Sequence, residues 1–362
     1  MKVTKFDVRR YSKPFEKPIS NGKYTYYATN TVICQIHTDE GITGVGWVDG
    51  TEIVFDTLKQ LEPLVVGEDP FNVERIWSKM YLPKIFGRKG LTTRAISAVD
   101  IALWDIIGKA SGKPLYQLLG GYRDEVPVYI AGGYYETDKS NALLKAEMEG
   151  NIAKGIKAIK MKIGRLPVKE DLKRIEAIRE QVGDQVEILV DANNAYSRLD
   201  ALKMGRMLDK LDVYWFEEPL APDDLAGAAE LAKTLDTPIA SGENEYTLWG
   251  FRDIIDSGSV DIINADAQVL GGITEWRKVA SYALAHHIPI APHGSQEIHV
   301  HLVASVPNGL IVEYYDSNLN ALSDAMFEQK LSLNPNGTVS PFQGPGLGVT
   351  INFAAIEPYR VG

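Results

Sequence analysis

The sequence predicts an α/β protein in which a closed barrel of alternating strands and helices follows a smaller α+β domain. Short apolar segments recur between residues 126 and 313 with amphipathic stretches between them, as expected for parallel strands joined by helical crossovers. Before residue 122, strand-like segments come first and helix-like segments follow, which indicates a separate α+β domain. A chain of 362 residues accommodates one large domain and a smaller partner.

The first domain is expected to span residues 1–122. Its amino terminus, MKVTKFDVRRYSKPF, alternates apolar and polar residues like a first strand. Residues 24–48 read as two further strands joined by a Gly-containing turn at residues 39–41. Apolar residues at spacings of three and four predict helices over residues 52–66, 71–81 and 91–111.

The barrel is expected to span residues 123–330, and the Gly- and Pro-rich segment 331–362 to return to the first domain. The predicted barrel strands are residues 126–131, 158–163, 186–191, 213–217, 238–242, 261–265, 288–292 and 310–313. Amphipathic stretches such as residues 169–182 and 200–211 supply the helices between them. A doubly wound open sheet is the alternative, but no G-x-G-x-x-G motif follows the first of these strands.

Composition excludes several functional classes. The formal net charge of −10 argues against nucleic acid, whose binding needs clustered Lys and Arg, but a local pocket can still accept a small anion. No run of eighteen apolar residues predicts a membrane span, and the amino terminus lacks the apolar core of a signal peptide. Cys34 is the single cysteine, so no internal disulfide forms and a cytoplasmic location fits.

Three evenly spaced carboxylates each end an apolar run: Asp191 in ILVDANN, Glu217 in VYWFEEP and Glu243 in IASGENE. The carboxyl ends of all strands in such a barrel face one rim, so these acids are expected to converge. Three oxygen ligands suit a hard divalent cation, and Mg²⁺ is the expected cofactor. As an alternative, Asp191 and Glu243 cap helices, which explains each residue alone but not the set in register.

Two lysines, Lys160 and Lys162, end the preceding strand and point to one face because they are two residues apart. Each raises the cost of charging the other, so we expect one to lose its proton near neutral pH and act as a base. A solvated strand edge is the alternative for an isolated K-x-K motif. The position immediately before the acidic series favours the functional interpretation.

Further polar residues follow the later strands. Asp266 and His293 end adjacent strands, and an Asp beside a His orients the ring as an acid or base. Glu313 ends the last strand, where it either hydrogen-bonds a substrate oxygen or caps the next turn. Asn193, two residues after the first acid, is expected to orient a ligand or water. His299 and His301, in contrast, fall in an amphipathic segment and are interpreted as structural.

These residues together resemble the mandelate racemase subgroup of the enolase superfamily, and the similarity extends over nearly the whole chain. The segment ISAVDIALWDIIGKASGKPLYQLLGG, residues 96–121, resembles the family's junction between its two domains. The resemblance implies a modified (β/α)7β TIM-type barrel under an α+β capping domain. It also implies a homo-oligomer, a dimer or an octamer.

The resemblance assigns a role to each rim residue. Asp191, Glu217 and Glu243 would bind Mg²⁺, while Lys162 and His293 would face opposite sides of the substrate α-carbon. Lys160 would neutralise a carboxylate oxygen, Asp266 would orient His293, and Glu313 would contact the substrate carboxylate. Enolase-superfamily sites with a Lys or His base and Mg²⁺ stabilising an enediolate are an established pattern.

The expected substrate is a sugar acid, an aldonate or aldarate, and the expected reaction is dehydration to a 2-keto-3-deoxy acid. The alternatives are racemisation or epimerisation of a 2-hydroxy acid, opening of an aldarolactone by a cycloisomerase, and a non-catalytic barrel that binds a metal or sugar acid. Specificity is expected from residues 12–27 and 47–51 of the capping domain. Candidate contacts there and nearby are Lys17, Lys23, Arg88, Tyr24, Tyr26 and Tyr27.

Overall fold

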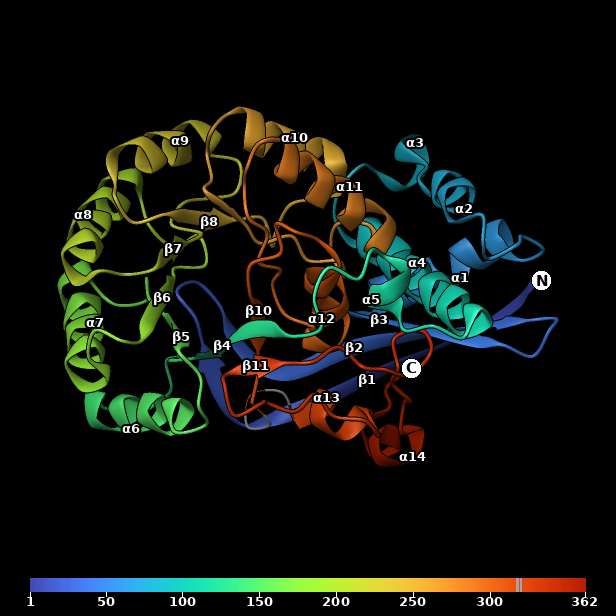
Figure 1. Ribbon diagram of the computed structural model, residues 1–362, viewed down its shortest axis with the longest axis horizontal. Coiled ribbons are helices and arrows are strands. Elements are labelled where there is room, and N and C mark those ends of the chain that lie inside the picture. Colours follow the sequence, from blue (N-terminus) through green and yellow to red (C-terminus); the bar gives the residue numbers. More distant parts are fainter. Residues whose placement is uncertain (317–318, 320) are drawn as a thin grey trace.

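The computed structural model describes residues 1–316, 319 and 321–362, and it contains an antiparallel sheet with its helices beside a barrel of parallel strands (Figure 1). The predicted α/β fold class, a (β/α)7β barrel with an α+β capping domain, is therefore confirmed. Within the described ranges, no helix is both long and apolar enough to cross a membrane.

The capping sheet has the order β1-β2-β3, with β1 at Val3–Ser20, β2 at Thr25–Thr38 and β3 at Thr43–Asp49. The helices that follow are α1 (Glu52–Val65), α2 (Val73–Met80), α3 (Pro83–Phe86), α4 (Leu91–Ser111) and α5 (Leu115–Leu118). The three longer helices agree with the predicted ranges to within two residues at each end, whereas α3 and α5 are too short to produce a periodic signal.

Helix α4 lies directly on strand β3, and two glycines make this contact possible. A Cβ atom at Gly44 would lie 2.1 Å from the Ala102 carbonyl oxygen, and one at Gly46 would lie 2.0 Å from that of Ala98. Both distances are far below van der Waals contact, so no larger residue fits without moving the helix. The close approach buries the α4 residues from Ala95 to Gly108.

The barrel strands run in parallel in the order β10-β4-β5-β6-β7-β8-β9. They are β4 (Val126–Gly132), β5 (Ala158–Lys162), β6 (Glu187–Asp191), β7 (Trp215–Glu217), β8 (Ile239–Ser241), β9 (Ile262–Ile263) and β10 (Val312–Tyr314). The crossover helices are α6 (Asn141–Ile152), α7 (Val168–Val182), α8 (Arg198–Leu208), α9 (Leu225–Thr234), α10 (Thr247–Asp256), α11 (Gly272–Ala285) and α12 (Gln296–Ser305). Figure 1 shows α6 to α11 forming an arc outside the strands.

The seventh predicted strand, residues 288–292, is present only as single bridges. Ile290 pairs in parallel with Ile263 of β9 and with Gly309 just before β10, and these bridges close the ring. The barrel interior confirms the closure, because one apolar cluster takes a side chain from every strand position: Tyr129, Ala158, Leu189, Trp215, Ala240, Ile262, Ala291 and Ile311. The prediction of eight strand positions is right, but a regular strand at the seventh is wrong.

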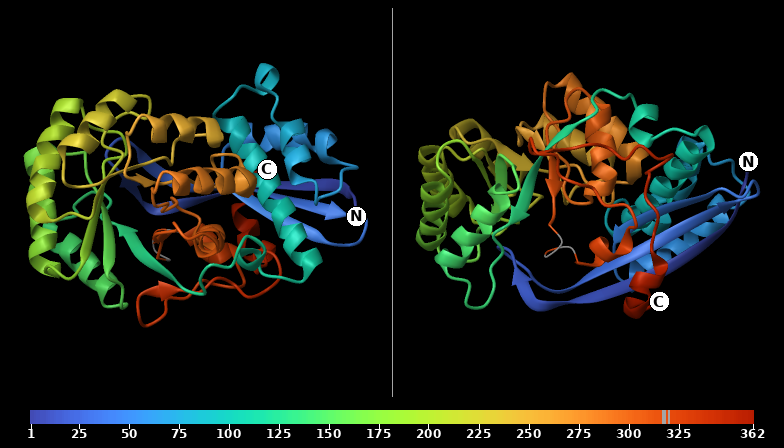
Figure 2. Two further views of the ribbon diagram at one scale, coloured as in Figure 1. Left: turned by 45° about the horizontal axis from the view of Figure 1, so that its top comes forward. Right: turned by 60° about the horizontal axis from the view of Figure 1, so that its bottom comes forward.

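The carboxyl-terminal segment contributes α13 (Ala321–Met326), β11 (Thr338–Val339) and α14 (Phe353–Ile356), and short 3-10 turns lie at residues 209–211 and 357–359. Strand β11 pairs with β4, and the last residues return to β1, where the Arg10 amide donates to Gly362 at 3.0 Å. At its other end β1 reaches the barrel, since Ser20 and Tyr135 exchange backbone hydrogen bonds of 2.8 Å (Figure 2).

Candidate active site

The site is built by the alternation of side chains along the barrel strands. Residues two apart on a strand point to the same face, so the residue two positions after an interior apolar residue also points into the barrel, one layer closer to the mouth. In six of the eight strand positions that residue is polar: Lys160, Asp191, Glu217, Asn264, His293 and Glu313. The apolar layer therefore forms the floor beneath a polar layer.

Three carboxylates converge at the barrel mouth, as their sequence positions predict. Asp191, Glu217 and Glu243 each offer an oxygen, and these atoms lie within 4.8 Å of one another. Asp191 and Glu217 are fully buried, and the Trp215 indole donates to Glu217 Oε2 at 3.0 Å. Oε2 of Glu243 is buried and accepts no hydrogen bond from any residue that the structure describes. Hard oxygen donors with an unsatisfied buried atom fit a divalent cation such as Mg²⁺.

The lysines of the K-x-K motif pair with these carboxylates. Lys160 Nζ lies 2.9 Å from Glu217 Oε1 and 2.8 Å from Glu313 Oε1, and Lys162 forms an ion pair with Asp191. Burial alone would lower the pKa of Lys160, but Glu217 and Glu313 outweigh it and hold the pKa well above its usual range. Burial is likewise outweighed at Lys162, whose pKa Asp191 raises.

In this arrangement the carboxylates oppose the expected loss of a proton from one of the two lysines, and the role of either lysine as a base stays a prediction. The carboxylates are closer to each ammonium group than the sequence pattern alone could show, and their attraction exceeds the repulsion between the two lysines.

His293 and Asp266 form the predicted pair at the other side of the layer. His293 Nδ1 lies 3.1 Å from Asp266 Oδ2, and Nε2 lies 3.6 Å from Glu243 Oε2. Burial would lower the pKa of His293, but Glu243 and Asp266 outweigh it and raise the pKa well above its usual value. His299 lies behind the pair: its Nε2 accepts from the Ala267 amide at 3.0 Å, and its Nδ1 contacts the Gly294 carbonyl at 2.6 Å.

Glu313 and Asn193 complete the set of predicted residues. Glu313 is fully buried, and its Oε2 accepts from the Gly294 amide at 2.7 Å. Burial would raise the pKa of Glu313, but Lys160 and His293 outweigh it and lower the pKa to about 2. The Asn193 amide donates to Asp191 Oδ1 at 2.8 Å, and its side chain donates to Glu243 Oε1 at 3.5 Å.

A cavity of ≈ 480 Å³ lies over His293, between the barrel mouth and the capping domain. Residues from both predicted capping segments line it, including Phe15, Ile19 and Tyr26 from the first and Trp47, Asp49, Gly50 and Thr51 from the second. Lys17, Lys23, Arg88, Tyr24 and Tyr27 do not line it. Among the described residues that do, Arg94 is the one Lys or Arg.

Sequence reasoning missed Arg94 and also Arg174, which hydrogen-bonds to the end of β5 at Lys162. Arg174 on α7 donates to the Lys162 carbonyl and to the Gly133 carbonyl, both at 2.9 Å, and pairs with Asp171 at 2.9 Å. In the sequence, both arginines resemble solvated positions on amphipathic helices. No local pattern distinguishes them, because their partners come from other elements.

Fold and site together define a barrel enzyme with an acidic metal site under a capping domain. Residues 3–120 match the model of the mandelate racemase/muconate lactonizing enzyme N-terminal domain, and residues 143–355 match that of the enolase C-terminal domain-like family. The chain belongs to the mandelate racemase/muconate lactonizing enzyme family of the enolase superfamily.

Among its relatives, arabinonate dehydratase of Saccharolobus solfataricus is 39% identical, over 91% of this chain and 90% of that protein. A 3,6-anhydro-alpha-L-galactonate cycloisomerase of Streptomyces coelicolor is 36% identical, over 91% of both chains.

Among solved structures, L-talarate/galactarate dehydratase from Salmonella typhimurium LT2, liganded with Mg and L-lyxarohydroxamate, superposes with a TM-score of 0.93 at 30% identity, covering 100% of this chain and 93% of that one. A racemase from Streptomyces coelicolor A3(2) with bound magnesium gives a TM-score of 0.92 at 33% identity, covering 99% and 100%.

Proposed function

We propose that the protein is a Mg²⁺-dependent dehydratase of a sugar acid, an aldonate or an aldarate. The observation that carries the proposal is the placement of two proton-transfer groups at either end of the carboxylate triad: Lys162 contacts Asp191, and His293 lies beside Glu243. The dehydratases among the relatives, including arabinonate dehydratase at 39% identity, support this reaction over others of the family.

Asp191, Glu217 and Glu243 would hold the cation. When bound, Mg²⁺ would supply positive charge to stabilise the negative charge that develops on the substrate carboxylate as the α-proton leaves. Lys160, fully buried beside Glu217, adds a fixed positive charge in the same layer. Fixed charges in a buried site stabilise such developing charge without reorganisation, which makes them effective in catalysis.

Lys162 receives the proton from C2 of the substrate, and the electron pair of the C–H bond moves toward the carboxylate to give an enediolate. Only the neutral amine accepts a proton, so Asp191 must release Lys162 before this step. Asp191 would instead bind the cation, because it is one of the three converging candidate ligands. Arg174 holds the Lys162 backbone carbonyl and thereby the direction of the side chain.

His293 then donates its proton to the C3 hydroxyl, which leaves as water while the C3–O bond breaks. Asp266 at 3.1 Å holds the ring orientation and stabilises its charged form before the transfer. The resulting enol tautomerises to a 2-keto-3-deoxy acid, so one molecule of acid gives one keto acid and one water. Glu313 positions Lys160 and the Gly294 amide, which follows His293 directly.

A cycloisomerase is the second candidate, because a cycloisomerase stands among the relatives at 36% identity. It would use the same first step and differ in the group that leaves from C3. Racemisation or epimerisation requires only that a proton returns from the opposite face. All three reactions therefore begin with removal of the α-proton.

The test is a screen of the Mg²⁺-loaded protein against sugar acids, beginning with arabinonate and galactarate, with a carbonyl-trapping reagent to detect keto products. Each acid is also incubated in deuterated buffer. Keto product establishes dehydration, and exchange without product indicates a racemase or epimerase. Lys162→Ala is expected to abolish both signals, whereas His293→Asn is expected to stop product and leave exchange. Full turnover by both variants would refute the two-base mechanism.

A further inference from the structure

A second buried carboxylate, Glu218, lies immediately behind the metal-site residues. It follows Glu217 directly after the end of β7, and its carboxyl group is directed at Asn194 and Asn244 of the neighbouring loops. Glu218 is 1% exposed and has a φ of 42°, in the left-handed region that a Glu residue rarely adopts. The surrounding contacts must hold it in this conformation.

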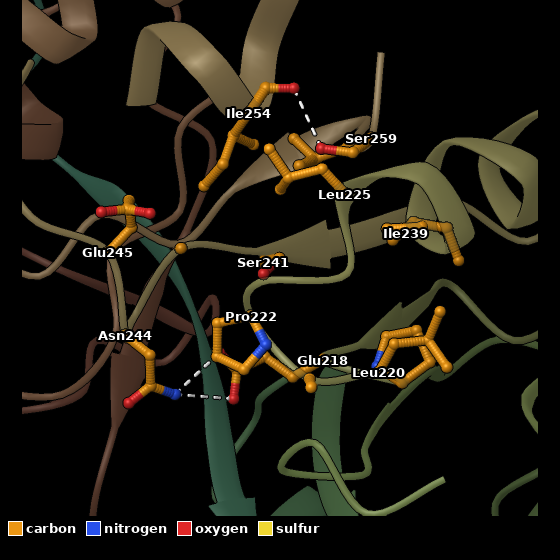
Figure 3. A pocket seen from close by; sticks show the side chains of 15 residues that line it. Glu218, Leu220, Pro222, Leu225, Ile239, Ser241, Asn244, Glu245, Ile254 and Ser259 are labelled. Atoms are coloured by element: carbon orange, nitrogen blue, oxygen red, sulfur yellow. Dashed lines mark hydrogen bonds between the residues drawn. The ribbon is translucent and has the colours of Figure 1, made fainter. Parts of the chain in front are cut away.

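Two carboxamides from the neighbouring loops supply those contacts. Asn194 Nδ2 donates to Glu218 Oε2 at 2.7 Å, and Asn244 Nδ2 donates to Oε1 at 2.9 Å and to Oε2 at 3.0 Å. Figure 3 shows the two hydrogen bonds between Asn244 and Glu218, which both line a small pocket of ≈ 20 Å³. The Glu218 carboxyl thus accepts a hydrogen bond from one donor on each side.

Each member of this network lies within three residues of a candidate metal ligand in the sequence. Asn194 follows Asp191 in the loop after β6, Glu218 follows Glu217 after β7, and Asn244 follows Glu243 after β8. The backbone connects the same loops, since the Asn194 amide donates to the Glu218 carbonyl at 2.7 Å and the Glu218 amide to that of Ala240 at 2.9 Å. A shift of the Glu218 side chain is therefore expected to move the backbone of all three loops that carry the candidate ligands.

We propose that Glu218, through Asn194 and Asn244, is a positioning residue that sets the spacing of Asp191, Glu217 and Glu243 for divalent-cation binding. The inference rests on the cation requirement of the proposed function. Residues that hydrogen-bond to metal ligands or to their loops increase metal affinity, because the ligand oxygens must be held at defined distances from the ion. Packing alone would be served equally well by an apolar side chain at position 218.

The test compares Mg²⁺ binding by calorimetry to the full-length protein and to the variants Glu218→Ala and Glu218→Gln, with folding checked by circular dichroism. The Ala variant is expected to bind Mg²⁺ about 10- to 100-fold more weakly. The Gln variant is expected to lose less than about 10-fold. Gln keeps one acceptor for Asn244. Its new amide nitrogen can donate to Asn194 Oδ1, which accepts no hydrogen bond from the described residues, once the Asn194 carboxamide turns over.

Asn308→Ala is the matched control. Asn308 donates to the Ala280 and Ile288 carbonyls, both at 3.1 Å, so its loss removes two hydrogen bonds from a loop that carries no candidate ligand. This variant is expected to lower the unfolding temperature and leave Mg²⁺ affinity unchanged. If Glu218→Ala does not fold, Asn194→Ala and Asn244→Ala, which each remove one donor, take its place and are expected to weaken binding.

The outcomes separate the two proposals. The positioning role would be overturned if folded Glu218→Ala, or both Asn variants in its place, bound Mg²⁺ as tightly as the unchanged protein. The proposed function would then remain intact. Failure of the unchanged protein to bind Mg²⁺ would overturn the metal site itself. A second readout uses Mn²⁺ as probe: a changed electron paramagnetic resonance spectrum in Glu218→Ala, with the spectrum of Asn308→Ala unaltered, is the expected signature of displaced ligands.

Discussion

His301 on α12 is a buried imidazole whose protonation is expected to destabilise the fold at acidic pH. Its side chain is fully buried, with Nδ1 accepting from the Tyr116 amide at 3.3 Å and Nε2 bonded to the Leu347 carbonyl at 3.0 Å. A protonated ring would direct a second N–H at the Tyr116 N–H. Burial lowers the pKa of His301 to about 4, and the bond to Leu347 opposes this only in part.

The magnitude follows from the difference between the folded and unfolded states. An unfolded histidine has a pKa of about 6.5, so between about pH 6.5 and about pH 4 the unfolded chain binds a proton that the folded chain does not. The contribution of neutral His301 to the free energy of unfolding is therefore fully present above this window and is lost as the pH drops through it. The shift corresponds to about 3 kcal/mol in all, of which about 2 kcal/mol is lost by pH 5.

The assay is urea unfolding at about pH 7.5, 6 and 5 of the unchanged protein and of His301→Gln, whose amide does not titrate. The substitution adds a constant offset, but the difference between the two proteins in unfolding free energy is expected to change by about 2 kcal/mol from pH 7.5 to 5. Buried carboxyls such as Asp100 titrate in both proteins and cancel. A difference that stays constant over this range would refute the reasoning.

Three further outcomes are expected. Arg174→Met leaves buried Asp171 unpaired and should lower the unfolding free energy by about 3 to 5 kcal/mol in urea; a loss below 1 kcal/mol would contradict the buried ion pair. Saturating Mg²⁺, at about 100 times its dissociation constant, should raise the unfolding free energy by about 2.7 kcal/mol relative to EDTA, and no change would contradict a metal site. Arg94→Met should reduce kcat/KM for a diacid such as galactarate roughly 10- to 100-fold more than for arabinonate, and equal losses would exclude a contact with a distal carboxylate.

The acids of the site were predictable because their signal is local. Each of three acids ends an apolar run: Asp191, Glu217 and Glu243. A charged side chain at the carboxyl end of a buried strand is expected to lie at the barrel mouth. The same argument located Lys160, since its face is fixed by the alternation of side chains along β5. In each case the position along a strand determines the position in space.

Features that depend on distances between elements were not predictable. Asp191 on the next strand raises the pKa of Lys162, and a sequence does not show how close the two side chains lie. Residues 288–292 have the apolar pattern of a strand because they are buried, but only Ile290 meets the pairing geometry on both sides. Arg94 was missed because its cavity exists only once the capping domain covers the barrel.

Gln268 connects the capping domain to the proton-transfer pair. Its backbone amide donates to Asp266 Oδ1 at 2.8 Å, and its side chain donates to the Trp47 carbonyl at 2.8 Å. Trp47 lies two residues before Asp49, which lines the cavity over His293. Side-chain changes at Asp49 that leave β3 in place should therefore alter substrate choice alone. Changes that move the Trp47 carbonyl should also disturb the orientation of His293, and so slow every substrate alike.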